Sequence, residues 1–361
     1  MNNIPKLMSG VYLTGHGGLD KLVYREDIPV PIPQAGEVLI EVKGAGVNNT
    51  DINTRLGWYS KKVTSDTNAG GKEGLLEVDD DDASWSGVPL RFPRIQGGDI
   101  CGKIVQVGEG VEQDRIGTRI LVRSMQNIPT KDNPLAMQTM GSEVDGGFAQ
   151  YCVAKAKESF PINCDWSDVE LASIPISYAT AEGMLCRADI EKETILITGA
   201  SGGVGSAVIQ LAKVRGAKII AQCAPDKAST LKELGADLTV YRNDDLVSVL
   251  GENSVDAVVD LVGGTSWPKL LDILRPGGKY VTSGAIAGPI VDLDLRSLYL
   301  KDLTLFGSTV NDPYVFENVI HCIEEGQIKP LVAQSFPLKE IYKAQTVFIE
   351  KKFIGKLVLI P

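Results

Sequence analysis

The segment from Glu193 to Lys213 constrains the fold of this chain more than any other. A short apolar run ends at Thr198, the glycine-rich sequence from Gly199 to Gly205 follows, and an apolar-periodic segment begins directly after it. This order predicts a strand, a tight turn and a helix, as in one crossover unit of a parallel sheet. Glycines let backbone amides approach a pyrophosphate, and the N-terminus of a helix adds partial positive charge. The turn is therefore a candidate dinucleotide site in the second half of the chain.

The pattern of apolar residues changes along the chain and indicates two domains. A chain of 361 residues is longer than a single hydrophobic core usually serves. In the first part, short alternating runs such as 37–43 and 102–108 lie between glycines and prolines and predict a small antiparallel barrel or sandwich. From Asp189 onward, strands alternate with helical patterns, which predicts a doubly wound parallel sheet in an α/β domain. The expected strands of that sheet are 194–198, 218–222, 238–241, 257–262, 279–283 and 303–308, and the expected helices are 204–215, 227–234 and 267–274.

Composition and charge argue against several classes of protein. The formal net charge of -10 argues against a nucleic-acid partner, because a phosphate backbone needs a positive surface. No apolar run reaches the roughly 20 residues of a membrane-spanning helix, and the N-terminus lacks the apolar core of a signal peptide. The 6 cysteines are scattered without close pairs, as in proteins of a reducing compartment. We therefore expect a cytoplasmic protein with neither a nucleic-acid nor a membrane partner.

One segment, 61–91, fits neither domain pattern. It is rich in Gly, Asp, Ser, Asn and Lys and has little periodicity, which predicts a long surface loop and a candidate lid. Its acidic run Asp79–Asp82 is interpreted as a solvated part of that loop.

The residues after the second expected strand bear on the choice between NAD and NADP. An acidic side chain at the end of this strand would bind the ribose 2′-hydroxyl of NAD, but residues 222–224 are neutral. Asp226 follows later and is expected to cap the next helix. Lys227 and Arg242 are candidates for pairing with a 2′-phosphate, or they are plain surface charges. Together these features favour NADP(H) as the cofactor and leave NAD as the alternative.

Several motifs occur in register along nearly the whole chain, at 46–59, 92–108, 146–151, 178–181, 199–205 and 355–358. Through them the chain resembles the medium-chain dehydrogenase/reductase superfamily, and specifically its zinc-free quinone oxidoreductase-like branch. The resemblance implies a GroES-like β-barrel catalytic domain over 1–160, completed by 311–361, and a Rossmann dinucleotide-binding domain over 161–310. It also implies a homodimer or homotetramer, paired through the edge strand at 303–308.

The short-chain dehydrogenases have a similar glycine turn, and 198–205 fits their pattern too. Those enzymes place the turn near the N-terminus and carry a later Tyr-x-x-x-Lys pair. The nearest stretch in spacing here, 348–352, contains no tyrosine. This disfavours the short-chain alternative.

Departures from the zinc alcohol dehydrogenases of the same superfamily predict a site without metal. The positions that match the ligands of their catalytic zinc are Asn48, Gly98 and Ile176, which do not form such a ligand set. The stretch matching their structural zinc lobe, 124–140, contains no cysteine. We therefore expect neither zinc ion.

Three residues of the first domain are candidate catalytic groups through the resemblance. Tyr59 matches a proton donor or substrate anchor of related enoyl thioester reductases, or it is a packing aromatic. Asn48 matches an asparagine near the nicotinamide, and Thr50 matches a proton-relaying hydroxyl. Arg55 is a candidate for attracting an acidic substrate, with a surface role as the alternative. The implied cofactor-binding residues are Thr180, Ala200, Ser201, Gly202, Gly203, Val204, Gly205, Gly263, Ser283, Gly284, Gly307, Ser308 and Lys356.

The resemblance implies hydride transfer from NADPH to a small-molecule substrate, either a quinone or an α,β-unsaturated carbonyl compound. Conjugation spreads the developing negative charge onto an oxygen that hydrogen bonds can stabilise without a metal. Reduction of an enoyl thioester is one alternative. A nucleotide-binding redox sensor or structural protein with little turnover is the other. The sequence does not identify the physiological substrate.

Overall fold

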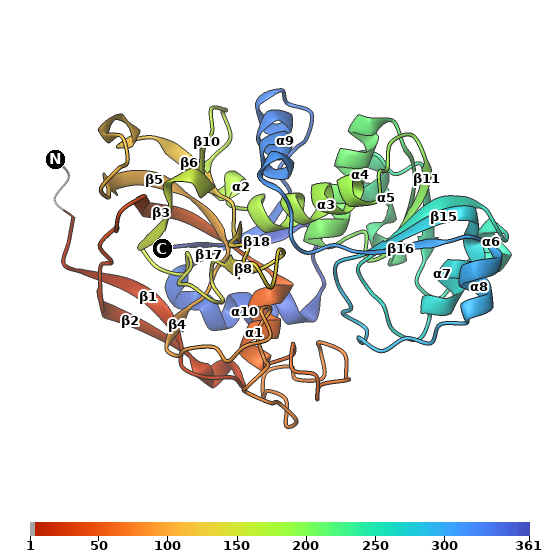
Figure 1. Cartoon of the computed structure of the whole chain (residues 1–361), viewed down its shortest axis with the longest axis horizontal. Coiled ribbons are helices and arrows are strands. Elements are labelled where there is room, and N and C mark those ends of the chain that lie inside the picture. The colour runs from red at the N-terminus through yellow and green to blue at the C-terminus, as the bar shows by residue number, and fades with distance from the viewer. Residues whose placement is uncertain (1–3) are drawn as a thin grey trace. The chain divides into compact units, whose positions relative to one another are not determined.

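The structure is a computed structural model that describes residues 4–361, and Figure 1 shows the course of the chain. The chain divides into two compact units. Unit 1 contains the residues up to Val63 together with Ala69–Ile176 and Ile320–Pro361, and unit 2 contains Thr64–Asn68 and Ser177–Val319. The domain boundaries expected after residues 160 and 310 stay predictions.

Unit 1 is built mainly of antiparallel strands. Its largest sheet has the order β10-β6-β5-β3-β18-β17, with β9 paired to β3, and β2-β1-β4 and β7-β8 form smaller sheets. The antiparallel β domain predicted from the sequence is confirmed. The strands are β1 (Leu7–Leu13), β2 (Leu22–Pro29), β3 (Glu37–Val47), β4 (Arg94–Ile95), β5 (Asp99–Val107), β6 (Arg119–Val122), β7 (Met125–Asn127), β8 (Met137–Thr139), β9 (Tyr151–Lys155), β10 (Ser159–Pro161), β17 (Val332–Pro337) and β18 (Lys356–Ile360).

Alternation along β3 explains how this strand contributes to a hydrophobic core of unit 1. Val38, Ile40 and Val42 are buried in the core, whereas Glu41 and Lys43 on the same strand are half-buried and pair with each other at 2.6 Å. A period of two residues places apolar side chains on one face of a sheet. The C-terminal segment joins the same core and adds β18 to the edge of β3. The helices of unit 1 are α1 (Asn49–Leu56), α2 (Asp168–Leu171) and α10 (Ile341–Glu350).

Unit 2 contains one six-stranded sheet in the order β13-β12-β11-β14-β15-β16. Every neighbouring pair in it is parallel, and the order is that of a doubly wound dinucleotide-binding sheet. The strands are β11 (Thr194–Ile197), β12 (Lys218–Cys223), β13 (Leu238–Tyr241), β14 (Val255–Asp260), β15 (Leu274–Thr282) and β16 (Thr304–Gly307). The helices are α4 (Gly203–Arg215), α5 (Ala228–Leu234), α6 (Leu246–Leu250), α7 (Trp267–Ile273) and α8 (Leu295–Leu300), while α3 (Pro175–Arg187) and α9 (Pro313–Glu324) lie at its boundaries.

The predicted strands and helices of this α/β unit are confirmed, with small differences at their ends. Pro225 begins a 3-10 turn over Pro225–Lys227, so Lys227 precedes α5 instead of lying in it. β15 begins earlier than expected, at Leu274, and its pairing with β14 shifts register near that end.

The segment 61–91 contains no helix or strand, as predicted, but it is not a freely solvated loop. The Lys61 amide donates to the Asp82 carboxylate at 3.0 Å, and Lys62 pairs with Asp79 at 2.9 Å. The Asp79 amide donates to the Ser60 hydroxyl, also at 3.0 Å. These contacts hold the acidic run against the beginning of the segment. We call the group of Lys61, Lys62, Asp79 and Asp82 the clasp.

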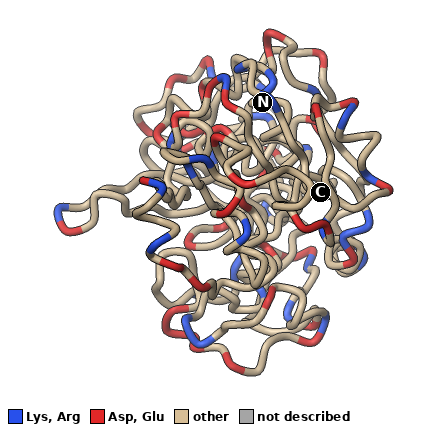
Figure 2. Tube along the Cα trace, turned by 90° about the vertical axis from the view of Figure 1, so that its right-hand side faces the viewer, with Lys and Arg blue, Asp and Glu red and all other residues tan. Residues whose placement is uncertain are grey.

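Within residues 4–361, no helix is long and apolar enough to cross a membrane. Acidic and basic residues are interspersed along the chain in the view of Figure 2.

Candidate active site

The predicted strand, glycine turn and helix are all present in unit 2. β11 ends at Ile197, and α4 begins at Gly203 after an N-cap at Gly202. Gly199 has a φ of 59°, in the left-handed region that favours glycine. A Cβ on Gly205 would lie 2.4 Å from the Gly199 carbonyl oxygen, so this position needs glycine. The backbone therefore has the close turn at a helix N-terminus that suits a pyrophosphate.

The remaining residues of the turn differ in exposure. Ala200 and Ser201 are buried, Val204 is half-buried, and the Gly202 backbone is exposed. Thr180 is half-buried on α3, which is tied to α4 because the Gln210 amide donates to the Tyr178 hydroxyl at 2.7 Å. The turn and α3 thus belong to one packed arrangement.

Most other predicted cofactor contacts lie at the carboxyl edge of the same sheet. Parallel pairing aligns the ends of β14 and β15 at Asp260 and Thr282, and it aligns the ends of β15 and β16 at Thr282 and Gly307. Residues directly beyond these ends therefore share one edge, where doubly wound sheets bind ligands. They are Gly263, Ser283, Gly284 and Ser308, with Gly307 as the last residue of β16. The Ser308 side chain is buried and its hydroxyl has no hydrogen-bond partner among the described residues.

Asp260 organises this edge, and the sequence analysis did not identify it. Its fully buried carboxylate accepts hydrogen bonds from Thr198 and Tyr280 and from the amides of Val262 and Gly263. A buried carboxylate requires such partners because burial without them is costly. The signal in the sequence was an aspartate directly after the apolar run 257–259. Asp260 therefore fixes the positions of the strand ends.

Lys227 and Arg242 follow neighbouring parallel strands, β12 and β13. The Lys227 side chain is buried, and burial together with the charge of Arg242 lowers its pKa, while Asp226 opposes the shift. The two positive charges repel each other beyond the ends of neighbouring strands, so an anion bound between them would stabilise the charged form of both. The plain surface role considered for Lys227 is therefore wrong, whereas Arg242 is exposed.

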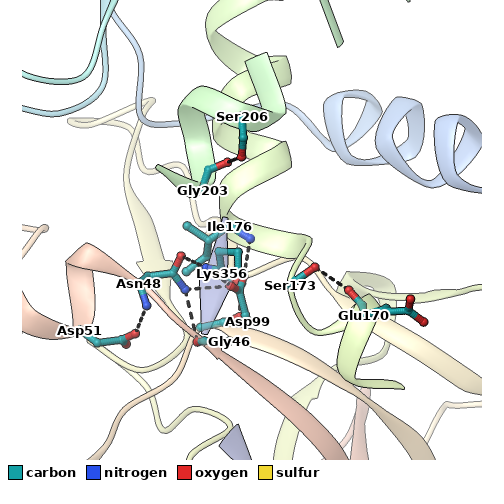
Figure 3. Close-up of polar contacts among 12 residues, drawn as sticks. Gly46, Asn48, Asp51, Asp99, Glu170, Ser173, Ile176, Gly203, Ser206 and Lys356 are labelled. Carbon is teal, nitrogen blue, oxygen red and sulfur yellow. Dashed lines mark hydrogen bonds and ion pairs between the residues drawn. The ribbon is translucent and has the colours of Figure 1, made fainter. Parts of the chain in front are cut away.

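Strand pairing in unit 1 brings three distant residues together. Gly46 pairs with Asp99 of β5 and with Val358 of β18, so Asn48 and Lys356 meet beside Asp99. Figure 3 shows the Lys356 ammonium between the Asn48 amide and the Asp99 carboxylate.

All polar atoms of this cluster have partners within the protein. Lys356 donates to Asn48 Oδ1 and pairs with Asp99 Oδ2 at 2.7 Å. Asn48 Nδ2 donates to Asp99 Oδ2 at 2.9 Å, and the Ile176 amide donates to Asp99 Oδ1. These contacts fix the orientation of the Asn48 amide. The sequence predicts that Lys356 approaches the cofactor, and the structure groups it with the catalytic candidate Asn48.

Asp51 adds a second buried carboxylate to the cluster. It accepts a hydrogen bond from the backbone amide of Asn48 at 2.7 Å, at the start of α1. Burial, with a smaller contribution from the charge of Asp99, raises the pKa of Asp51 to about 7, although the backbone amide of Asn48 and the charge of Lys356 act in the opposite direction. This contact makes Asp51 a structural hydrogen-bond acceptor at the start of α1.

Tyr59 and Thr50 form a pair of hydroxyl groups next to this cluster in the chain. The Tyr59 hydroxyl donates to Thr50 Oγ1 at 3.0 Å. Burial raises the pKa of Tyr59 to about 12, and hydrogen bonds with Thr50, Trp85 and Asn53 only partly offset this. The phenol is therefore protonated at neutral pH.

Arg55 lies elsewhere in α1, and both roles considered for it are wrong. Its side chain is 0% exposed and donates to the Gly17 and Gly71 carbonyl oxygens and to Gln345 Oε1. It therefore joins chain segments inside unit 1 and is not available to a substrate.

The positions that match zinc ligands in related enzymes do not fit a zinc ion. Asn48 already accepts a hydrogen bond from a buried ammonium, and a Cβ on Gly98 would contact the Ile176 side chain at 2.5 Å. A divalent cation beside the Lys356 ammonium would be repelled. In the part of the chain that the structure describes, no group of three or more His, Cys, Asp or Glu side chains is placed to hold a metal. Zinc independence itself stays a prediction.

Comparisons with known proteins match both units. Residues 34–163 match the alcohol dehydrogenase GroES-like domain, and residues 203–325 match the domain described as zinc-binding dehydrogenase. The chain is 26% identical to human quinone oxidoreductase, with 98% of each chain covered. It is also 26% identical to acryloyl-coenzyme A reductase of Metallosphaera sedula, with 98% of this chain and 99% of that protein covered.

A solved structure is more similar in sequence. A protein from Sinorhizobium meliloti 1021, provisionally described as an alcohol dehydrogenase, is 44% identical, with a TM-score of 0.87 over 100% of this chain and 98% of that one. The fold is thus that of a two-domain oxidoreductase with a GroES-like part and a Rossmann part, as predicted. The chain belongs to the medium-chain dehydrogenase/reductase superfamily.

Proposed function

We propose that this oxidoreductase transfers hydride from NADPH to a quinone or an α,β-unsaturated carbonyl compound without a metal ion. The observation that carries the proposal is the combination of a protonated Tyr59–Thr50 pair with a buried ammonium beside the position where related enzymes hold zinc. A nicotinamide cofactor, when bound, supplies the hydride. The protein then has to orient the two reactants and manage one proton and the developing negative charge.

Tyr59 is the proposed proton donor to the reduced substrate. The phenol is protonated at neutral pH, and its contact with Thr50 fixes the position of the hydroxyl group. Thr50 provides the neighbouring hydroxyl through which a proton can return to Tyr59. The Lys356 ammonium, which is paired with Asp99, holds the side chain of Asn48 in place.

The glycine turn, Thr180 and the strand ends of unit 2 would hold the dinucleotide. Residues 199–205 and the N-terminus of α4 fit its pyrophosphate. The unpartnered Ser308 hydroxyl suits a polar group of the cofactor. Lys227 and Arg242 would bind the 2′-phosphate of NADPH, because an anion relieves the repulsion between them.

The choice of NADPH is tested by the double substitution of Lys227 and Arg242 to Ala. Loss of two charge-assisted contacts should weaken NADPH binding about tenfold or more, with NADH binding almost unchanged. Fluorescence titration with each nucleotide measures this. Lys232→Ala, an exposed lysine on the neighbouring helix α5, is the matched control. Equal losses for both nucleotides would remove the assignment to the 2′-phosphate.

The reaction is tested by NADPH oxidation with 9,10-phenanthrenequinone, an acyclic enone and crotonyl-coenzyme A. Tyr59→Phe should lower kcat about 100-fold with little change in NADPH affinity. Tyr24→Phe removes a hydroxyl from β2 and should leave kcat unchanged. Tight NADPH binding without oxidation by any acceptor would instead favour a sensor or structural role. Preference for the thioester would favour an enoyl thioester reductase, as the similarity to acryloyl-coenzyme A reductase allows.

We further propose that the protein forms a homodimer through β16. This strand lies at the edge of the six-stranded sheet, and the neighbouring helix α8 exposes Leu295, Tyr299 and Leu300. An open strand edge with apolar side chains beside it is suited to pairing with a second copy. Light scattering should report a dimer, or a tetramer built from it, and a monomer would contradict the proposal.

A further inference from the structure

An aromatic cluster surrounds the proposed proton donor. The Tyr59 ring lies 5.8 Å from the Trp58 ring and 6.0 Å from the Trp85 ring, centroid to centroid, and both contacts are edge to face. All three side chains are half-buried. Trp58 and Tyr59 directly follow α1, whereas Trp85 is contributed by the segment 61–91.

Trp85 is held in place from both sides. Ala83 and Ser84, which precede it, are buried, and the Ser84 hydroxyl donates to the Val88 carbonyl oxygen at 2.6 Å. The Ser86 hydroxyl donates to the Glu143 carboxylate at 2.9 Å. Such contacts restrict the backbone on either side of the indole.

The other carboxylate oxygen of Glu143 accepts a hydrogen bond from the Thr139 amide at 2.9 Å. The clasp formed by Lys61, Lys62, Asp79 and Asp82 closes the earlier part of the same segment. The segment therefore presents Trp85 on an anchored loop, next to the tyrosine that the proposed reaction uses.

The charge of this segment is unfavourable for a phosphorylated substrate. It contains the run Asp79–Asp82 and Glu77 close to Trp85 in sequence, and Lys62 is already paired with Asp79. Negative charges near a site repel phosphate groups. An uncharged planar substrate meets no such repulsion and gains contact area from aromatic side chains.

We propose that Trp85 is a specificity-determining residue that selects planar, uncharged, conjugated ring compounds, such as quinones, over phosphorylated thioesters. This inference rests on the proposed function, because it places the substrate beside Tyr59. The indole supplies a rigid apolar surface for a ring, and the acidic clasp disfavours coenzyme A esters.

The experiment compares Trp85→Leu with Trp166→Leu, which changes a half-buried tryptophan outside this cluster. Binding of 1,4-naphthoquinone to the full-length protein saturated with NADP⁺ is measured by calorimetry. Trp85→Leu should weaken quinone binding about tenfold, whereas Trp166→Leu should bind the quinone as the unsubstituted protein does. The NADPH affinity of both variants should stay close to that of the unsubstituted protein.

Turnover provides the second readout. Because Trp85 also forms a hydrogen bond with Tyr59, any effect of Trp85→Leu on kcat should be shared by both acceptors. The decrease in kcat/KM should be about tenfold greater for 9,10-phenanthrenequinone than for an acyclic enone, mainly through KM. Equal effects on both acceptors, or quinone binding unaffected by Trp85→Leu, would overturn the inference. Quinone binding that needs Trp85, without turnover of any acceptor, would refute the proposed reaction and keep Trp85 as the ring-binding residue.

Discussion

At the scale of single residues, Asp51 couples the stability of the protein to pH. Its pKa is about 7 in the folded chain, against an ordinary value of 3.8. Between these values the folded protein holds a proton that the unfolded chain has released. The contribution of Asp51 to stability is therefore largest below pH 4 and decreases as pH rises through 7.

Asp51→Asn should remove this pH dependence. An amide can accept the hydrogen bond from the Asn48 backbone without carrying a charge. Relative to the unsubstituted protein, the variant should gain roughly 2–4 kcal/mol in free energy of unfolding between pH 4 and pH 8. Urea denaturation at both pH values measures the difference. A constant difference between the two proteins would show that Asp51 does not titrate in this range.

Arg55 is a structural residue whose loss should be costly. It donates to two carbonyl oxygens and to Gln345, and all these contacts are inside unit 1. Arg55→Leu would leave buried acceptors without partners and should lower the free energy of unfolding by about 3 kcal/mol. Arg296→Leu, at an exposed arginine paired with Asp294, should cost less than about 1 kcal/mol. Similar losses in both variants would contradict this assignment.

At the scale of elements, the pairing of β3 with β5 and β18 determines where the polar cluster forms. Gly46 is central to it, because a Cβ there would lie 2.5 Å from both the Ala172 carbonyl oxygen and Asp99 Oδ2. Gly46→Ala should therefore displace Asp99 and lower the free energy of unfolding by about 2 kcal/mol. Gly15→Ala is the control, since nothing lies within 4 Å of its added Cβ. Thermal unfolding of the two variants measures the difference, and equal stability would contradict the crowding at Gly46.

The elements themselves were largely predictable from the sequence, because their patterns are local. The glycine turn from Gly199 to Gly205 was predicted from its own residues and the segments directly beside it. Alternation within 37–43 was enough to predict β3. The cluster of Asn48, Asp99 and Lys356 was not predictable, because it depends on the register between strands far apart in the chain. The same reason explains the hidden position of Arg55.

Irregular backbone limited the prediction for the segment 61–91. Its composition indicated a loop, and the structure contains neither helix nor strand there. The clasp between Lys61 and Asp82, and the contact between Trp85 and Tyr59, follow no sequence period. Such contacts are set by tertiary packing, so only the structure could assign a role to Trp85.

At the scale of the whole molecule, each unit contributes a different part of the proposed chemistry. Unit 2 presents the glycine turn and the strand edge suited to a dinucleotide. Unit 1 presents the hydroxyl pair of Tyr59 and Thr50 and the cluster around Lys356. The superfamily includes zinc-dependent enzymes, and we propose that this chain reduces its substrate with the Lys356 ammonium beside the position where they hold a metal.

The most direct test of that claim is NADPH oxidation by 9,10-phenanthrenequinone after dialysis against a chelator, with zinc content determined on the same sample. The metal-free protein should keep its full turnover, and added zinc should not increase it. Loss of turnover on chelation, with recovery at one equivalent of zinc per chain, would contradict the proposed mechanism.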